Sequence, residues 1–218
     1  MKPQNFDNEN NSYVSKELKV LKLVQGLQGF PKLINSFETS NHSYIVMENL
    51  SVNYVDLFDY VCSQKNRIDR KTASLIIKQL IICILDLIKL NIFYSDIKLD
   101  NVMLRKDLKS IKLIDFSDVH FGSPWTTYAV STIGYFSPES VRGKLFDITR
   151  SAVFSIGCFT YTLIKGDYAF DSIEELLSFI PPVVRTDNII NDFIKVTLIK
   201  SLLDRPKLED LLKHPFLS

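Results

Sequence analysis

The stretch that decides the fold of this chain is YSDIKLDN, residues 94–101. It precedes a short strand candidate at residues 102–104, and a second candidate at 111–114 leads directly into the sequence Asp-Phe-Ser. A loop followed by a β-hairpin can bring polar side chains from both ends of such an arrangement into one cleft. We expect three polar residues to line that cleft: Asp96, Asn101 and Asp115.

These residue types suit phosphoryl transfer. That reaction needs a carboxylate near the attacking hydroxyl, oxygen ligands for Mg²⁺ and a cation that balances the charge of the γ-phosphate. Asp96 and Lys98 can supply the carboxylate and the cation, while Asn101 and Asp115 can supply metal ligands. An Asp-Asn pair in a loop is also common in ordinary turns, so these residues gain their meaning from the motifs around them.

Motifs on both sides resemble those of the Ser/Thr protein kinases. TIGYFSPE at 132–139 resembles the end of the kinase activation segment, and Asp-Arg-Pro at 204–206 resembles the late arginine motif. Met-Glu-Asn-Leu at 47–50 resembles the hinge, with Met47 as the gatekeeper. The resemblance runs from about residue 15 to the end and rests on six motifs in the right order and spacing.

The resemblance implies an α+β, protein-kinase-like fold with a mainly helical C-lobe and an incomplete, β-containing N-lobe. It divides the chain into a truncated N-lobe at 1–50 and a C-lobe at 51–218. Hydrophobic periodicity agrees with this division. It predicts strands at 32–37 and 43–48 and helices at 15–27, 72–90, 152–164, 173–179, 188–203 and 207–212.

The resemblance also implies roles for individual residues. Asp96 matches the catalytic-loop aspartate, Lys98 the lysine typical of Ser/Thr-directed members, and Asn101 and Asp115 the metal ligands. Glu139 is expected to pair with Arg205 and to position a loop. The implied cofactors are ATP and Mg²⁺, and the residues expected to bind the nucleotide are Lys2, Glu17, Glu48, Leu50, Asp56 and Met103.

Two of these assignments have alternatives. Lys2 precedes Glu17 by a spacing that suits the lysine that pairs with the helix-C glutamate, or it is an unstructured terminal residue. Asp56 and Asp59 either contact ribose or a basic substrate residue, or they are acids that stabilise the N-terminus of a helix.

A closer likeness is to the Pim-type kinases. Their counterparts resemble three segments of this chain: VDLFD at 55–59, KLIDF at 112–116 and RSAVFSIG at 150–157. Ala152 stands where most kinases carry Asp, and the Pim family also has Ala there and is active. This likeness implies protein substrates with basic residues flanking the Ser or Thr. Asp56 and Asp59 would contact those basic residues.

The chain also departs from the family pattern. Its first glycine is Gly26, so no Gly-rich phosphate loop precedes the helix at 15–27. Ser95 replaces the arginine that usually receives an activation-loop phosphate, and no Lys or Arg occurs between Lys112 and Arg142. Ser117 replaces the glycine after Asp-Phe, which restricts the backbone there.

Two hypotheses of different classes follow. The first is an ATP-dependent kinase that phosphorylates Ser or Thr in basic proteins. The alternative is a catalytically impaired pseudokinase, a decoy that binds kinases or their substrates as an interaction module. A chain that lacks its true N-terminus would favour the first hypothesis, because the Gly-rich strands would then lie upstream.

Composition narrows the partners and the setting. With 218 residues, 46% hydrophobic and a net charge of +1, the chain carries no strong field for nucleic acid or an anionic membrane. Its three cysteines are far apart and show no zinc spacing, which favours a reducing compartment. We expect a cytoplasmic protein, possible in the nucleus too or, if viral, in the host cytoplasm, and the sequence indicates no oligomeric state.

Overall fold

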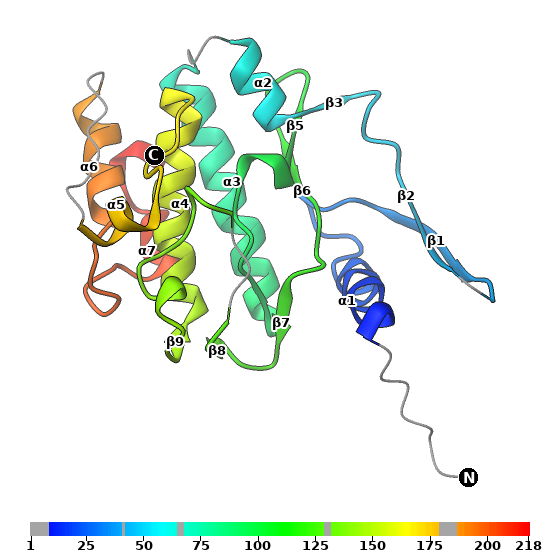
Figure 1. Ribbon diagram of the computed structural model, residues 1–218. Helices are drawn as coiled ribbons and strands as arrows, with labels where there is room; N and C mark the ends of the chain where they lie inside the picture. Colours follow the sequence, from blue (N-terminus) through cyan, green and yellow to red (C-terminus); the bar gives the residue numbers. More distant parts are fainter. Residues whose placement is uncertain (1–8, 41, 65–67, 129–131, 179–186) are drawn as a thin grey trace.

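A computed structural model describes residues 9–40, 42–64, 68–128, 132–178 and 187–218. Figure 1 shows a helical body and, beside it, a β-hairpin with one helix beneath it. The helices are α1 (Glu9–Leu23), α2 (Leu57–Ser63), α3 (Arg70–Lys89), α4 (Ile148–Lys165), α5 (Ile173–Ser178), α6 (Asn188–Thr197) and α7 (Leu208–Leu211). Short 3-10 turns lie at η1 (Leu99–Asn101), η2 (Ser140–Arg142) and η3 (Pro215–Leu217).

The strands form four small antiparallel sheets among the described residues. The hairpin joins β1 (Leu33–Glu38) to β2 (Ser43–Met47). A three-stranded sheet orders β3 (Tyr54–Asp56), β5 (Val102–Arg105) and β6 (Ile111–Leu113). Two further pairs join β4 (Ile92–Tyr94) to β7 (Val119–Phe121) and β8 (Trp125–Thr126) to β9 (Phe146–Asp147).

The two long helices α3 and α4 form the centre of the helical body. Asp69 begins α3 by accepting hydrogen bonds from the Thr72 backbone N–H at 3.0 Å and its hydroxyl at 2.6 Å, as an N-cap residue does. Asp147 caps α4 in the same way through Thr149, and Gly166 ends α4 with a φ of 75°. Every residue of α4 from 151 to 160 is buried, so this helix is surrounded by protein on all sides.

Most of the predicted elements are present, but their ends differ. The first helix begins at Glu9 instead of residue 15 and ends at Leu23, because the chain turns through Gly26 with a φ of 87°. The helix expected at 188–203 stops at Thr197. It stops early because the carbonyls of Ile199 and Lys200 accept hydrogen bonds from the buried Arg205 side chain instead of from the next helical turn.

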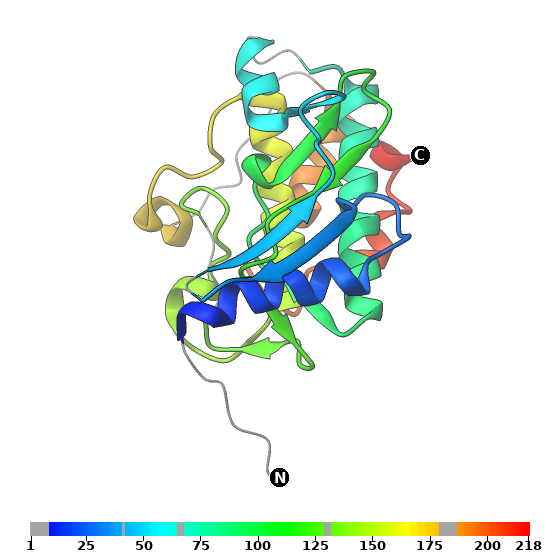
Figure 2. The ribbon, with the colours of Figure 1, turned by 90° about the vertical axis from the view of Figure 1, so that its right-hand side faces the viewer.

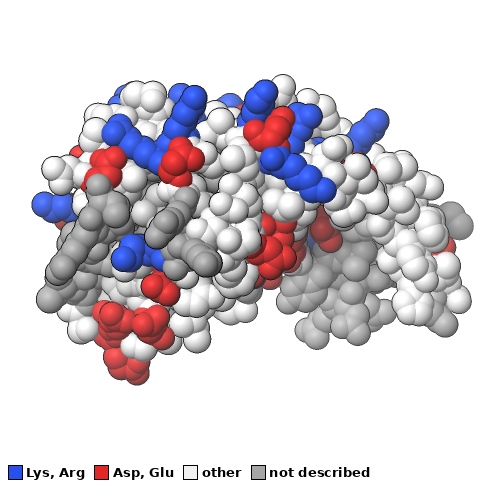
Figure 3. Space-filling view, turned by 90° about the horizontal axis from the view of Figure 1, so that it is seen from above, with Lys and Arg blue, Asp and Glu red and all other residues white. Residues whose placement is uncertain are grey.

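No helix in the described part of the chain is long and apolar enough to cross a membrane. The face of the molecule seen from above carries separate small groups of basic and acidic side chains, without one large field of either sign (Figure 3). Charged side chains on this face therefore act locally, on their near neighbours.

Candidate active site

The β5–β6 hairpin brings the two ends of the decisive stretch together. Val102 pairs with Leu113, and the Ile114 N–H donates to the Asn101 carbonyl at 2.9 Å, which extends the pairing by one step. Asp115 follows at once, with a φ of 59° that is unusual for a residue other than glycine. The hairpin thus places Asn101 beside Asp115, as the sequence predicts.

Asp96 is held from two sides in the loop before this hairpin. It is 5% exposed, and its Oδ2 accepts a hydrogen bond from Asn101 Nδ2 at 2.9 Å and lies 2.7 Å from Lys98 Nζ. Its other carboxylate oxygen, Oδ1, is buried and has no hydrogen-bond partner among the described residues. A buried oxygen without a hydrogen-bond partner costs folding free energy, so such an oxygen often has a functional role. Because Asn101 and Lys98 fix the orientation of the carboxylate through Oδ2, Asp96 is a candidate acceptor for a substrate proton.

Asn101 uses its side-chain nitrogen entirely on Asp96. Nδ2 donates both to the Asp96 carboxylate and to the Asp96 backbone carbonyl, each at 2.9 Å. This orientation of the amide leaves the Asn101 Oδ1 available as a ligand oxygen.

Lys98 connects the catalytic loop to the activation segment. Its Nζ lies 3.3 Å from Thr132 Oγ1 as well as beside Asp96. Partial burial lowers the pKa of Lys98, but the hydrogen bond to Asp96 and the negative charges of Asp96, Asp100 and Asp115 outweigh it and raise the pKa overall. Lys98 is therefore a stable positive charge in this cleft.

The Asp115 side chain is exposed, and one of its carboxylate oxygens accepts hydrogen bonds from a neighbouring residue. Its Oδ1 accepts hydrogen bonds from the Ser117 hydroxyl at 2.6 Å and from the Ser117 N–H at 3.2 Å. Ser117, which stands where kinases usually have glycine, therefore holds the carboxylate in one orientation. The described residues contain no group of three or more His, Cys, Asp or Glu side chains placed to hold a metal. The Asn101 amide oxygen and the Asp115 carboxylate nevertheless fit Mg²⁺, which prefers few protein oxygens and keeps several waters.

Glu17 reaches the same region from α1. Burial and the negative charge of Asp115 both raise its pKa, which places the two carboxylates near each other. Lys2, the predicted partner of Glu17, lies outside the described residues. The structure thus brings Glu17 to the cleft and leaves the proposed ion pair as a prediction.

In the hinge segment at 47–50, some backbone groups are without backbone hydrogen bonds among the described residues, whereas the Glu48 side chain contacts Lys112 and Lys32. The Glu48 carboxylate uses Oε1 both to pair with Lys112 and to accept the Lys32 N–H at 2.7 Å. Backbone hydrogen bonds among the described residues use the Glu48 N–H, but neither the Glu48 carbonyl nor the Leu50 N–H. These two backbone groups could contact a nucleotide, and the binding role of the Glu48 side chain stays a prediction.

Asp56 and Met103 face each other across the β3–β5 pair. The Asp56 carboxylate caps α2 by accepting the Asp59 N–H at 3.1 Å, which is the structural alternative stated for this residue. Burial, with the charges of Asp59 and Asp100, raises the pKa of Asp56 against the effect of its backbone hydrogen bonds. Capping does not exclude a ligand contact, so the binding role of Asp56 stays a prediction.

Two hydrogen bonds near the cleft were not predicted from the sequence. The Ser95 hydroxyl donates to the Asp118 carbonyl at 3.1 Å, and the Tyr94 hydroxyl donates to the Ile114 carbonyl at 3.1 Å. Burial and the charges of Asp96 and Asp115 raise the pKa of Asp118, which therefore lies near these two carboxylates of the cleft. In the sequence, the only indication that Asp118 lies here is that it follows Asp115 by three residues.

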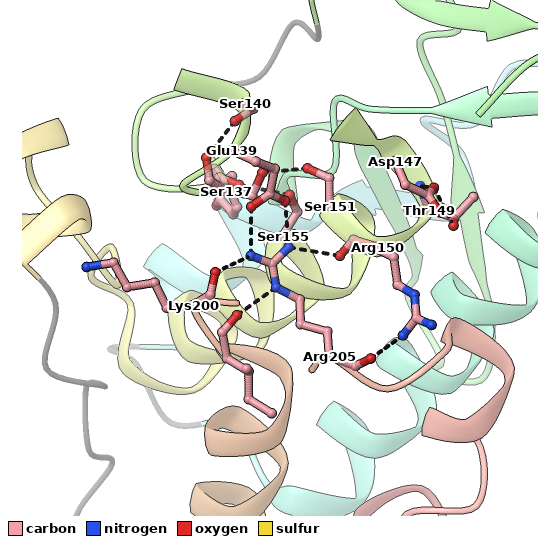
Figure 4. Close-up of polar contacts among 12 residues, drawn as sticks. Ser137, Glu139, Ser140, Asp147, Thr149, Arg150, Ser151, Ser155, Lys200 and Arg205 are labelled. Atoms are coloured by element: carbon pink, nitrogen blue, oxygen red, sulfur yellow. Dashed lines mark hydrogen bonds and ion pairs between the residues drawn. The ribbon is translucent and has the colours of Figure 1, made fainter. Parts of the chain in front are cut away.

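The expected pair between Glu139 and Arg205 is present (Figure 4). Arg205 is 1% exposed and donates to both carboxylate oxygens of Glu139, at 2.5 and 2.8 Å. Its other hydrogen bonds go to the carbonyls of Ile199, Arg150 and Lys200, so all five guanidinium donors are used. The pair anchors the end of the activation segment to the helical body and takes no part in the cleft.

An apolar pocket lies between the activation segment and α5. It begins one residue after Thr132, the residue that Lys98 contacts, and is therefore close to the candidate acceptor site. Its lining consists of Ile133, Gly134, Phe136, Phe170, Ser172, Ile173 and Leu176.

Comparison with known proteins agrees with this geometry. The family model described as protein kinase domain matches residues 1–217. The chain belongs to the protein kinase family. The kinase-like fold and the resemblance to Ser/Thr kinases are therefore confirmed.

Three curated relatives are Ser/Thr or death-associated kinases. The chain is 29% identical over 218 residues to death-associated protein kinase dapk-1 of Caenorhabditis elegans and 30% identical over 188 residues to Ser/Thr-protein kinase ppk6 of Schizosaccharomyces pombe. It is 26% identical over 196 residues to Ser/Thr-protein kinase pim-2 of Danio rerio. These alignments cover 94%, 84% and 89% of this chain but only 15%, 24% and 63% of the relatives.

Proposed function

We propose that this protein kinase transfers the γ-phosphoryl group of ATP to Ser or Thr hydroxyls of protein substrates. The observation that carries the proposal is Asp96, whose buried Oδ1 has no hydrogen-bond partner among the described residues while Lys98 and Asn101 hold Oδ2. A substrate hydroxyl bound beside Lys98 would have the Asp96 carboxylate as its hydrogen-bond acceptor.

Each residue of the cleft then has a defined task. Asp96 orients the hydroxyl and receives its proton, and Lys98 offsets negative charge on the transferred group. Asn101 and Asp115 would hold Mg²⁺, which when bound neutralises phosphate charge. The Glu48 carbonyl and the Leu50 N–H are available to a nucleotide base.

The finer substrate preference rests on acidic residues. Asp59 is exposed at the start of α2, and the charges of Asp59 and Asp100 both act on Asp56, so three carboxylates lie close together. This grouping supports a preference for substrates with basic residues near the acceptor. The apolar pocket beside Thr132 supports binding of an extended peptide next to it.

A phosphorylation assay tests the proposal. Wild-type protein with labelled ATP and Mg²⁺ should label basic Ser/Thr peptides but not the same peptides with Ala at the acceptor. Asp96→Asn should reduce the rate by about a hundredfold or more, as expected for loss of a general base. Asp107→Asn is the matched control, because Asp107 is exposed in the turn between β5 and β6, at the far end of this hairpin from Asn101 and Asp115, and it should keep most of the activity.

One observation favours the pseudokinase as a second candidate. In the described part of the chain, the sheet above the cleft consists of β1 and β2 alone, so no strand covers a nucleotide from the far side. Positioning is most of what a kinase supplies, so a one-sided site would bind and react weakly. Wild-type activity no higher than that of Asp96→Asn, together with no stabilisation by Mg-ATP, would favour a binding module.

A further inference from the structure

Lys112 connects two segments that are far apart in the sequence. It lies on β6, and its Nζ donates to the Phe30 carbonyl at 3.0 Å and pairs with Oε1 of the Glu48 carboxylate. The Leu113 N–H donates to the Gly29 carbonyl at 2.8 Å, so the segment between α1 and β1 lies along β6. The Lys112 side chain is only 16% exposed. Its ammonium group therefore links β6 both to the chain before β1 and to the chain after β2.

The Glu48 carboxylate replaces a backbone group in the β1–β2 ladder. The two strands, which lie across α1 in Figure 2, pair as far as Leu33 and Met47, and the next pair is Lys32 with Glu48. In a hydrogen-bonded antiparallel pair, each N–H donates to the carbonyl of the other residue. Here the Glu48 N–H donates to the Lys32 carbonyl at 2.9 Å, but the Lys32 N–H donates to the Glu48 carboxylate at 2.7 Å. The side chain thus accepts the bond that would otherwise go to the Glu48 carbonyl.

The charge of Glu48 favours this arrangement. Burial raises the pKa of Glu48, but the hydrogen bonds from the Lys112 side chain and the Lys32 N–H outweigh it and lower the pKa overall. An ionised carboxylate is a stronger acceptor than a neutral carbonyl, so it competes well for the Lys32 N–H. Lys112 is itself placed by its bond to the Phe30 carbonyl and by the Tyr54 ring, whose centroid lies 5.8 Å from Nζ.

We propose that Lys112 is a positioning residue for the nucleotide: it fixes the Glu48 carboxylate on the Lys32 N–H and so keeps the Glu48 carbonyl free to accept a hydrogen bond from the base. This inference rests on the proposed function, in which the Glu48 carbonyl and the Leu50 N–H are available to a base. Without Lys112 the carboxylate loses its partner, and the Lys32 N–H can donate to the Glu48 carbonyl as in a regular ladder. That bond would direct the carbonyl toward β1 and away from a base.

Steady-state kinetics separate positioning from simple stabilisation. Lys112→Met should raise the KM for ATP by about three- to tenfold, the size of one hydrogen bond, while kcat stays within about twofold of wild type. Lys112→Arg should keep most of the affinity, because arginine can donate to the same two oxygens. Lys109→Met, an exposed change in the turn between β5 and β6, is the control and should match wild type. A pair that only stabilises the fold would lower the melting temperature and leave the KM for ATP unchanged.

A binding measurement distinguishes failure of this inference from failure of the proposed function. Adenosine carries the base but no phosphate, so its affinity reports on the hinge segment and not on the metal ligands. Titration followed by NMR should give a Kd about three- to tenfold weaker for Lys112→Met than for wild type. Equal affinity in the two folded proteins would overturn this inference alone. Wild-type protein that binds neither adenosine nor Mg-ATP would overturn the proposed function and this inference with it.

Two variants of the carboxylate cover the case in which Lys112→Met fails to fold. Glu48→Gln keeps a side-chain oxygen that can accept the Lys32 N–H, whereas Glu48→Met has none, so Glu48→Met should lose more affinity for adenosine. Equal affinity of these two variants would contradict the exchange of carbonyl for side chain. In a crystal structure of Lys112→Met, the Lys32 N–H should donate to the Glu48 carbonyl. A carboxylate that still accepts that N–H would refute the role of Lys112.

Discussion

The surroundings of Glu17 disfavour the ionised form of its carboxyl group. Burial and the neighbouring Asp115 charge raise its pKa above the ordinary value of 4.5. An acid with a raised pKa binds its proton more tightly in the folded state than in the unfolded state. Ionised Glu17 therefore costs stability, and this cost is absent at low pH and appears as the pH rises through the folded-state pKa.

We predict that Glu17→Gln raises the melting temperature at neutral pH. The gain should shrink as the pH falls toward and below 4.5, where the wild-type carboxyl is also protonated. Thermal unfolding of both proteins across this pH range measures the effect. A lower melting temperature for Glu17→Gln at neutral pH would instead indicate a cationic partner and support the predicted pair with Lys2.

Helices α4 and α6 pack against each other, and Gly157 of α4 lies at their contact. A Cβ atom at Gly157 would lie 2.5 Å from Thr197 Oγ1 and 2.7 Å from Leu198 Cδ2. Both neighbours are buried, so they have little room to move. The packing of these helices thus depends on the absence of a side chain at one position.

We predict that Gly157→Ala destabilises the protein by about 1–3 kcal/mol, as overpacked cores do. Helix propensity alone predicts a gain of about 1 kcal/mol, so the sign decides between the two effects. Denaturant unfolding measures the change, with Lys195→Ala on the exposed face of α6 as a control that should be nearly neutral. A stabilised Gly157→Ala protein would show that the two helices can separate without cost.

The activation segment is held by contacts that need no phosphate. Its start is fixed by the β4–β7 pair and by the hydrogen bond from Ser95 to Asp118, and its end is fixed by Glu139 and Arg205. Thr126 pairs with Phe146 in β9, and its hydroxyl donates to the Tyr128 carbonyl. His120 on β7 offers little positive charge, because burial and Lys16 lower its pKa.

We predict that activity does not depend on phosphorylation of Thr126, Thr127 or Ser131, the last of which lies outside the described residues. A phosphate adds about −1.5 to −2 charge and orders a loop only where a cation receives it. Ser95 cannot supply that cation, and residues 113–141 contain no Lys or Arg. Phosphatase treatment and the triple alanine variant should leave the rate unchanged, and a large loss in both would refute this prediction.

At the scale of the whole molecule, the two sides of the cleft are unequal. The lower side carries Asp96 in the loop before the β5–β6 hairpin and Asn101 and Asp115 at its two ends, whereas the described upper side has only β1, β2 and α1. A ligand that binds only the folded protein stabilises it by RT ln(1 + [L]/Kd), about 2.7 kcal/mol at a hundredfold excess over Kd. Weak binding therefore produces a small thermal shift at ordinary ATP concentrations.

We predict that Mg-ATP raises the melting temperature of wild type slightly and that of Asp115→Asn not at all. The amide side chain removes the negative charge that would meet the metal. Glu174→Gln, an exposed change on α5, is the control and should respond as wild type does. Equal shifts in wild type and Asp115→Asn would show that nucleotide binding does not use this residue.

The sequence by itself determined the order of the elements and the identity of the cleft residues. YSDIKLDN, the hairpin and Asp-Phe-Ser are local in sequence, so strand pairing over a few residues was enough to bring Asn101 beside Asp115. The Glu139–Arg205 pair was also foreseen, because its two motifs were recognisable even though the residues are 66 positions apart.

The tertiary structure alone decided those features of the protein that no local sequence pattern indicates. The early end of α6 follows from Arg205, which takes carbonyls that a longer helix would have used. The hydrogen-bonding of Ser95, the position of Asp118 and the need for Gly157 all depend on neighbours distant in the chain. Periodicity reports which face of an element is buried, but only packing determines which group lies against it.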